Sequence, residues 1–256
     1  MAHHLARGLL DTARHGAPRH LSRGTASTPG SAAFDVLPVT VDAMTTSALT
    51  ARARDEQTTL HGIMSAVVLQ ALASEYGGVA RLLCGSPVDL RRYLSPPIGD
   101  AVGFYVGMAQ AAHTVDASVS PWDLARTIHH EIAKQIAGGV PILFHGLTWL
   151  GFRLDVKRHP TPAAFVAHVR RHPARPSSTL TNLGRLDVPD TYGGVRLTGL
   201  HLAVAPTPLS EFASAATGFA GHVHWNFSVD TAEIEPARAR RLVASAVERL
   251  QHAIHR

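Results

Sequence analysis

One polar segment of the chain, Ser86-Pro87-Val88-Asp89-Leu90-Arg91-Arg92-Tyr93-Leu94-Ser95-Pro96-Pro97, carries residue types that suit the wall of a binding site. It follows the apolar run Leu82–Cys84, which is typical of a buried strand, and two prolines stiffen its far end. An arginine can hold a carboxylate in a planar, bidentate geometry that a lysine cannot provide. The spacing therefore predicts a pair between Asp89 and Arg91, either as part of a site or as a local salt bridge at the end of the strand.

Two later segments carry further candidates. In Thr179-Leu180-Thr181-Asn182-Leu183-Gly184, the amide of Asn182 could bind a carbonyl or amide group, and Gly184 permits a close approach of backbone. The alternative is that Asn182 only closes a turn. In His224-Trp225-Asn226-Phe227-Ser228, the alternation predicts a core strand with Trp225 and Phe227 on one face.

In this order and at this spacing, the three segments resemble the C-terminal half of the superfamily of condensation domains and polyketide-associated acyltransferases. That superfamily includes the phthiocerol dimycocerosyl transferases and has the chloramphenicol-acetyltransferase-like fold. The resemblance runs from about Leu37 to the C-terminus. It implies a tunnel in which an acyl group passes from a thioester to an alcohol or amine. The implied donors are acyl-coenzyme A or a phosphopantetheinyl acyl carrier protein, with no bound cofactor.

The resemblance also assigns roles to single residues. Arg91 is the candidate for the arginine that pairs with the aspartate of the family's His-His-x-x-x-Asp-Gly motif, and Asp89 would lie with it at the tunnel floor. Asn182 and Gly184 match the strand that crosses the tunnel in relatives. The segment from Trp225 falls where condensation domains carry Asp-Phe-Gly-Trp, but it reproduces none of those residues in register.

The His-His-x-x-x-Asp-Gly motif itself is missing. In relatives its second histidine acts as the base on the acceptor. After His3-His4 the two positions required to be Asp and Gly hold Gly8 and Leu9, and after His129-His130 they hold Lys134 and Gln135. We therefore assign no catalytic residue to this chain, and expect it to correspond to the half of the enzyme that lacks the base.

Three functions remain open. The first is an incomplete acyltransferase chain that forms the donor side of the tunnel and works with an N-terminal half, or self-associates. The second is a non-catalytic module that binds a carrier protein or an acyl ligand. The third is a hydrolase or transferase in which a local histidine, such as His61 or His113, acts as base.

The composition narrows the classes of partner. With 256 residues and 45% hydrophobic residues, the chain can bury a core of ordinary size. Its net charge is +5, but only Lys134 and Lys157 are lysines and the arginines are spread along the chain, so nucleic acid is not expected. The single cysteine, Cys84, allows no disulfide within the chain, which suits a cytoplasmic location. No apolar run reaches the ~18 residues of a membrane span.

The seventeen histidines look compositional. His222 and His224 would share one strand face with His201 on a neighbouring strand, and such a set could bind a metal. No Asp, Glu or Cys stands at a spacing that completes it, so no metal site is expected.

Periodicity predicts an α+β fold: a mixed, largely antiparallel sheet covered by helices on one face, as in a chloramphenicol-acetyltransferase-like subdomain. Residues 1–35 are rich in Arg, Gly, Ser, Thr and Pro and are expected to be linker-like, to pack poorly and to add little stability, so that the subdomain comprises residues 36–256. Strands are expected at 36–41, 81–88, 102–112, 178–183, 195–205, 211–219 and 221–229. Helices are expected at 45–54, from 60 to Gly77-Gly78, from Pro121 to Gly138-Gly139, and at 142–152, 161–171 and 235–254. The last four strands are expected to form a meander.

Overall fold

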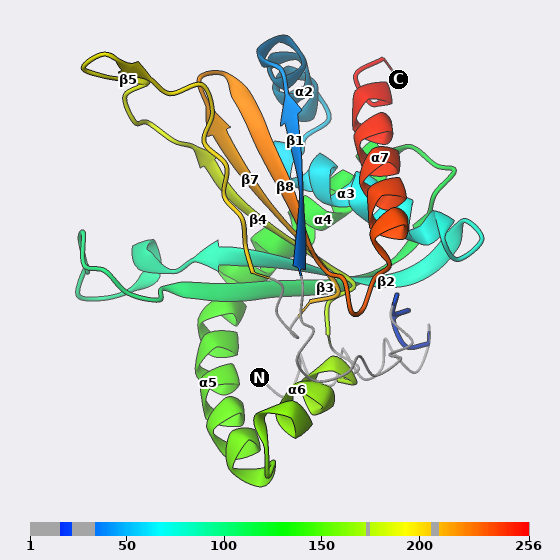
Figure 1. Ribbon diagram of the computed structural model, residues 1–256, viewed down its shortest axis with the longest axis vertical. Helices are drawn as coiled ribbons and strands as arrows, with labels where there is room; N and C mark the ends of the chain where they lie inside the picture. Colours follow the sequence, from blue (N-terminus) through cyan, green and yellow to red (C-terminus); the bar gives the residue numbers. More distant parts are fainter. Residues whose placement is uncertain (1–15, 22–33, 173–174, 206–209, 256) are drawn as a thin grey trace.

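The computed structural model describes residues 16–21, 34–172, 175–205 and 210–255 (Figure 1). Most of the linker-like segment 1–35 lies outside these residues. The elements in chain order are β1 (Phe34–Val41), α2 (Ala43–Asp55), α3 (Leu60–Ser74), β2 (Val79–Asp89), the 3₁₀ turn η1 (Arg91–Tyr93), β3 (Val106–Asp116), α4 (Pro121–Ala137), α5 (Val140–Arg158), α6 (Pro162–Arg170), β4 (Ser178–Arg185), β5 (Thr191–Tyr192), β6 (Val195–Arg196), β7 (Phe212–Phe219), β8 (His222–Asp230) and α7 (Pro236–His252).

Six strands form one mixed sheet in the order β1-β8-β7-β4-β2-β3. The β4 strand runs parallel to both of its neighbours, β2 and β7, and all other pairs are antiparallel. The predicted α+β class with a mixed, largely antiparallel sheet is confirmed. The strands β5 and β6 form a separate small hairpin that projects from the body of the molecule (Figure 1).

Helix α3 is buried around its whole circumference, as its wide apolar pattern predicted. It packs on the sheet through β2 and is covered by α4 and α7 on its other side. Its start is set by Thr59, whose side chain accepts a hydrogen bond from the amide of Gly62. The start of α4 is set in the same way by Ser120 followed by Pro121. Local capping therefore places the two helices on which the core is built.

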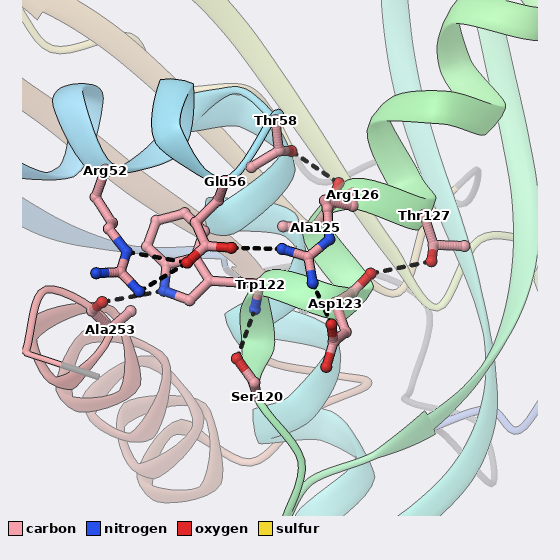
Figure 2. A network of polar contacts seen from close by, with 10 residues as sticks. All are labelled: Arg52, Glu56, Thr58, Ser120, Trp122, Asp123, Ala125, Arg126, Thr127 and Ala253. Atoms are coloured by element: carbon pink, nitrogen blue, oxygen red, sulfur yellow. Dashed lines mark hydrogen bonds and ion pairs between the residues drawn. The ribbon is translucent and has the colours of Figure 1, made fainter.

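Polar contacts connect helices α2, α4 and α7 (Figure 2). Glu56, at the C-terminal cap of α2, accepts from Arg52 and from Arg126 of α4. The indole of Trp122 donates to the carbonyl of Ala253, just past α7, over 3.1 Å. These links hold α2 and α4 at fixed positions around α3, whose first turn is therefore held in place.

Three expectations for the strands need correction. The strand predicted at 102–112 lies at Val106–Asp116, where its register against β2 is continuous. The last strands do not form a simple meander, because β4 pairs with β7 in parallel. The long connection between them permits this, since parallel pairing needs a crossover of a dozen or more residues. Of the strand predicted at 195–205, only Val195–Arg196 pairs with another strand.

Residues 16–21 depart from the expectation of poor packing. Leu21 is buried in the core, and its amide donates to the carboxylate of Glu211 over 2.8 Å. The amide of Arg19 donates to the carbonyl of Arg81, and Ser177 donates to the carbonyl of Arg19. Backbone hydrogen bonds and one buried leucine are enough to offset the entropy cost of ordering this short stretch.

Replacing Leu21 by Ala is expected to lower the free energy of unfolding by about 2–4 kcal/mol, the usual cost of a cavity at a buried leucine. Urea denaturation followed by circular dichroism measures it. Met44→Ala, at an exposed position on α2, serves as the control and should change stability by less than about 0.5 kcal/mol. Equal stability of the two variants would show that residues 16–21 are detached in solution.

Candidate functional site

A cavity of about 810 Å³ lies beside the C-terminal end of β4. Its walls come from α2, the start of α3, the loop after β4 and the β7–β8 hairpin. The lining residues are Thr46, Thr50, Arg54, Leu60, Met64, Asn182, Gly184, Arg185, Leu186, Asp187, Val188, Asp190, Gly218, Phe219, Ala220, Gly221, His222 and Val223. A concave space of this size, apolar in most of its lining and with a few polar groups, is the usual form of a small-molecule site.

Asn182 and Gly184 both line the cavity. The side-chain oxygen of Asn182 accepts a hydrogen bond from the amide of Gly184 over 2.8 Å, and Gly184 has a left-handed φ of +68°. Asn182 therefore closes a turn, as the simpler interpretation of the sequence held. The two interpretations are compatible, because the amide also carries an NH₂ group that can donate to a ligand.

Asp89 and Arg91 lie outside the cavity lining. The amide of Arg91 donates to the carboxylate of Asp89 over 3.0 Å, and a guanidinium nitrogen lies 3.5 Å from the same oxygen. The two side chains are 51% and 46% exposed, and the guanidinium packs over the ring of Tyr105. The predicted pair forms, but as a local contact to one oxygen atom and without the bidentate geometry. Of the four candidate residues, Asn182 and Gly184 therefore line the cavity, whereas Asp89 and Arg91 lie elsewhere.

The two histidines considered as bases also lie outside the cavity lining. The Nε2 atom of His61 lies 2.9 Å from the hydroxyl of Ser86, which is itself buried. Burial, and then the charge of His129, lower the pKa of His61 to about 4, so the ring is neutral at neutral pH. His113 is buried as well. A general base must come within hydrogen-bond reach of its substrate, and neither ring is placed for that.

Sequence reasoning missed several residues of the cavity. Arg54 comes from α2, Arg185 is the last residue of β4, and Asp187 and Asp190 come from the loop that follows. The only available signal was the polar composition of that loop between two strand patterns. His222 lines the cavity too, next to His224 on the same strand. In the part of the chain that is described, no group of three His, Cys, Asp or Glu side chains is arranged to hold a metal ion.

Comparison with solved structures shows the fold. Polyketide synthase associated protein 5 from Mycobacterium tuberculosis matches with a TM-score of 0.62 at 17% identity, over 96% of this chain and 60% of that one. A trichothecene 15-O-acetyltransferase from Fusarium sporotrichioides matches with a TM-score of 0.64 at 15% identity, over 91% and 49%. A nonribosomal peptide synthetase cyclization-docking bidomain from Sorangium cellulosum matches with a TM-score of 0.64 at 15% identity, over 98% and 48%. The chain spans about half the length of these structures.

Within the described residues, no helix is both long and apolar enough to cross a membrane.

No curated protein matches the sequence significantly. The sequence model described as "Phthiocerol/phthiodiolone dimycocerosyl transferase C-terminus" matches residues 30–233, which is most of the chain. The resemblance carried by the three motif segments is therefore confirmed: this chain belongs to the phthiocerol/phthiodiolone dimycocerosyl transferase C-terminus family, a family of acyltransferase- and condensation-type domains.

Proposed function

We propose that this chain forms the donor side of an acyl-transfer site, in which an acyl group leaves a thioester for an alcohol or amine. The observation that carries the proposal is the cavity of about 810 Å³ lined by Asn182 and Gly184, in a chain of this acyltransferase family. The base comes from an N-terminal half with the His-His-x-x-x-Asp-Gly motif, on the same polypeptide or on a separate one. Asp89 and Arg91 belong to the edge of that junction rather than to the cavity.

The cavity suits a thioester donor chemically. Leu60 and Met64 of α3, with Phe219 and Val223 of the hairpin, offer apolar contacts to an acyl chain. A pantetheine arm contains amide groups, and the NH₂ group of Asn182 is a suitable donor to their carbonyl oxygens. The proposed donor is therefore acyl-coenzyme A or an acyl group on the phosphopantetheine arm of a carrier protein.

Exposed apolar side chains mark the surface on which the N-terminal half would dock. Val102 is fully exposed and Phe104 is 76% exposed, in the loop that follows the Asp89–Arg91 pair. The ring of Phe104 stacks on His145 of α5, with 5.7 Å between ring centroids. This joins the loop to a row of exposed leucine and isoleucine side chains on α5, namely Ile142, Leu143, Leu147 and Leu150. Contiguous apolar surface of this kind in a globular protein usually marks an interface.

The chain is expected to bind a related N-terminal half, or itself, at micromolar concentration. Replacing Val102 and Phe104 together by Asp should weaken this association at least about tenfold, because two charges would be buried without partners. Light scattering, with the chain alone and with the added half, measures the association. Val79→Asp is the control, since Val79 is also apolar and exposed but lies at the other end of β2.

The same experiment tests Arg91. If Arg91→Ala leaves the association unaltered, Arg91 does not belong to the interface. A chain that stays strictly monomeric and ignores the added half would count against the incomplete-enzyme proposal. The alternative, a non-catalytic module for a carrier protein or acyl ligand, is favoured by the positions of His61 and His113 outside the cavity lining. It predicts that the assembled halves bind an acyl donor without turning it over.

A further inference from the structure

A short segment, residues 199–202, lies across the face of β7 and β8 that points away from the helices; we call it the strap. Trp225 and Phe227 of β8 face the helical core, so the side chains between them, His224 and Asn226, point to the opposite face. The chain reaches the strap from the projecting β5–β6 hairpin and runs back along the sheet (Figure 1). Because the strap forms no ladder of hydrogen bonds with a neighbouring strand, the strand predicted at 195–205 is limited to Val195–Arg196.

Side chains of the sheet hold the strap. The hydroxyl of Thr217, on β7, donates to the carbonyl of Leu200. The amide of Asn226, on β8, donates to the carbonyl of Leu202 over 2.9 Å. Both side chains are buried. The strap is therefore attached through a few side-chain contacts to its carbonyl groups.

The ring of His224 lies directly beneath the strap and is 3% exposed. At Gly199 the strap approaches so closely that an added Cβ atom would lie 2.9 Å from the His224 ring. The ring of His201, on the strap itself, lies with its centroid 4.5 Å from that of His224. His222 stacks on the other side of His224 with 6.2 Å between centroids. The three imidazoles therefore form a row, with His224 next to both of the others.

The arrangement favours a neutral ring at His224. The Nε2 atom of His224 is buried without a partner, while its Nδ1 atom lies 3.4 Å from the hydroxyl of Thr40. His201 is exposed on the strap, and its Nδ1 atom donates to the Oδ1 atom of Asn226 over 2.9 Å. A proton added at His224 would place a positive charge beside the His201 and His222 imidazoles in a poorly solvated place.

Among the residues that the structure describes, no carboxylate contributes to the surroundings of His224. β1 contributes the hydroxyl of Thr40, and β7 contributes the neutral Thr217 at the position paired with His224. The strap and β8 contribute His201 and His222. Burial, followed by the charges of these two imidazoles, lowers the pKa of His224 below its usual 6.5.

We propose that the strap is released by mild acid, because a proton on the buried ring of His224, directly beneath Gly199, separates the strap from the sheet. Above pH 6.5 the ring of His224 is neutral and the attached state is favoured. Once the strap leaves, His224 is solvated and its pKa returns towards 6.5, so the released state binds more protons. The attached state is therefore lost as the pH falls below 6.5. For each extra proton that the released state binds, the ratio of attached to released strap falls by up to about tenfold per pH unit.

The strap is linked to the cavity through one residue. His222 is among the residues that line the cavity, and its ring stacks on that of His224. The strap is also continuous with the β5–β6 hairpin, which would gain freedom to move. The release follows from the positions of the imidazoles and holds whatever the cavity binds.

A nitroxide label next to the strap tests the proposal on the full chain. Ala203→Cys provides an exposed attachment site, and Cys84 does not compete because it is buried and its pKa is raised to about 11. Electron paramagnetic resonance spectra are expected to change from an immobilised to a mobile line shape between about pH 7.5 and about pH 5. A label at the exposed Ala244 of α7 should keep its line shape over the same range.

The histidine variants assign the effect. His201→Gln retains a donor for Asn226 but removes an imidazole that lowers the pKa of His224, so the release should move to a lower pH. His252→Gln, at the end of α7, should leave the transition unchanged. The proposal is overturned if the wild-type strap has the same mobility at both pH values, or if His201→Gln has the wild-type midpoint. It is also overturned if the Ala244 label becomes mobile at the same pH, because the transition is then acid unfolding of the whole domain. If the His201→Gln variant does not fold, the wild-type labels at the strap and at Ala244, compared at the two pH values, decide whether the proposal holds.

Discussion

Joining the chain to an N-terminal half that carries His-His-x-x-x-Asp-Gly is expected to raise the rate of acyl transfer by about 10²–10⁴-fold over the chain alone. The chain alone should show no transfer above background, because neither His61 nor His113 lies at the cavity and no other base is assigned to it. The rate can be measured as free thiol released from an acyl-coenzyme A in the presence of an alcohol acceptor. The control is the same half with the second histidine of its motif replaced by Ala, which should restore the background rate.

A single variant separates the contribution of this chain from that of the added half. Asn182→Asp keeps an oxygen that accepts from the amide of Gly184, so the turn is preserved, but it removes the NH₂ donor. In the assembled enzyme we expect KM for the acyl donor to rise about 3–10-fold, the usual worth of one hydrogen bond, with kcat little changed. Robust turnover by the isolated chain that is abolished by one histidine substitution would overturn the proposal and favour a local base.

Replacing Arg175 by Met is expected to lower the free energy of unfolding by about 3–5 kcal/mol, the largest effect on stability that we predict for one side chain. Arg175 donates to Glu233 over 2.7 Å and to the carbonyl of Ser210 over 2.9 Å, and it lies 3.8 Å from Glu211. The side chains of Arg175 and Glu211 are each only 1% exposed. Without the guanidinium, Glu211 and Glu233 each lose a buried positive partner, and a less compensated buried charge is costly. Glu233 retains its ion pair with Arg170, and Glu211 still accepts from the amide of Leu21.

Urea denaturation of matched variants measures this effect. Arg91→Met removes an arginine from an exposed ion pair and should change stability by less than about 0.5 kcal/mol. Equal stability of Arg175→Met and the wild type would show that the carboxylates find other partners.

Short-range patterns in the sequence predicted much of the fold. Thr58 or Thr59 before an apolar helical pattern predicted the start of α3, and the structure shows Thr59 as its cap. Ser120-Pro121 predicted the start of α4. The three motif segments predicted the family, which the match over residues 30–233 confirms. Each of these features depends on residues close together in the chain.

The candidate residues illustrate the limit of local spacing. Asp89 and Arg91 are two positions apart, which is enough to predict that they meet, but the spacing does not say how much solvent surrounds them. Asn182 and Gly184 likewise form a local turn. Only the approach of α2, α3 and the β7–β8 hairpin turns that segment into the wall of a cavity.

The sequence alone determined the types of most elements, the helix starts and the family, because caps, periodicity and motif spacing are properties of neighbouring residues. The tertiary structure decided the parallel pairing of β4 with β7, the attachment of residues 16–21 and the path of the strap. It also decided the burial of Arg175 with Glu211 and Glu233. All of these depend on contacts between residues far apart in the chain, whose free energy comes from shared burial and from hydrogen bonds that no local pattern records.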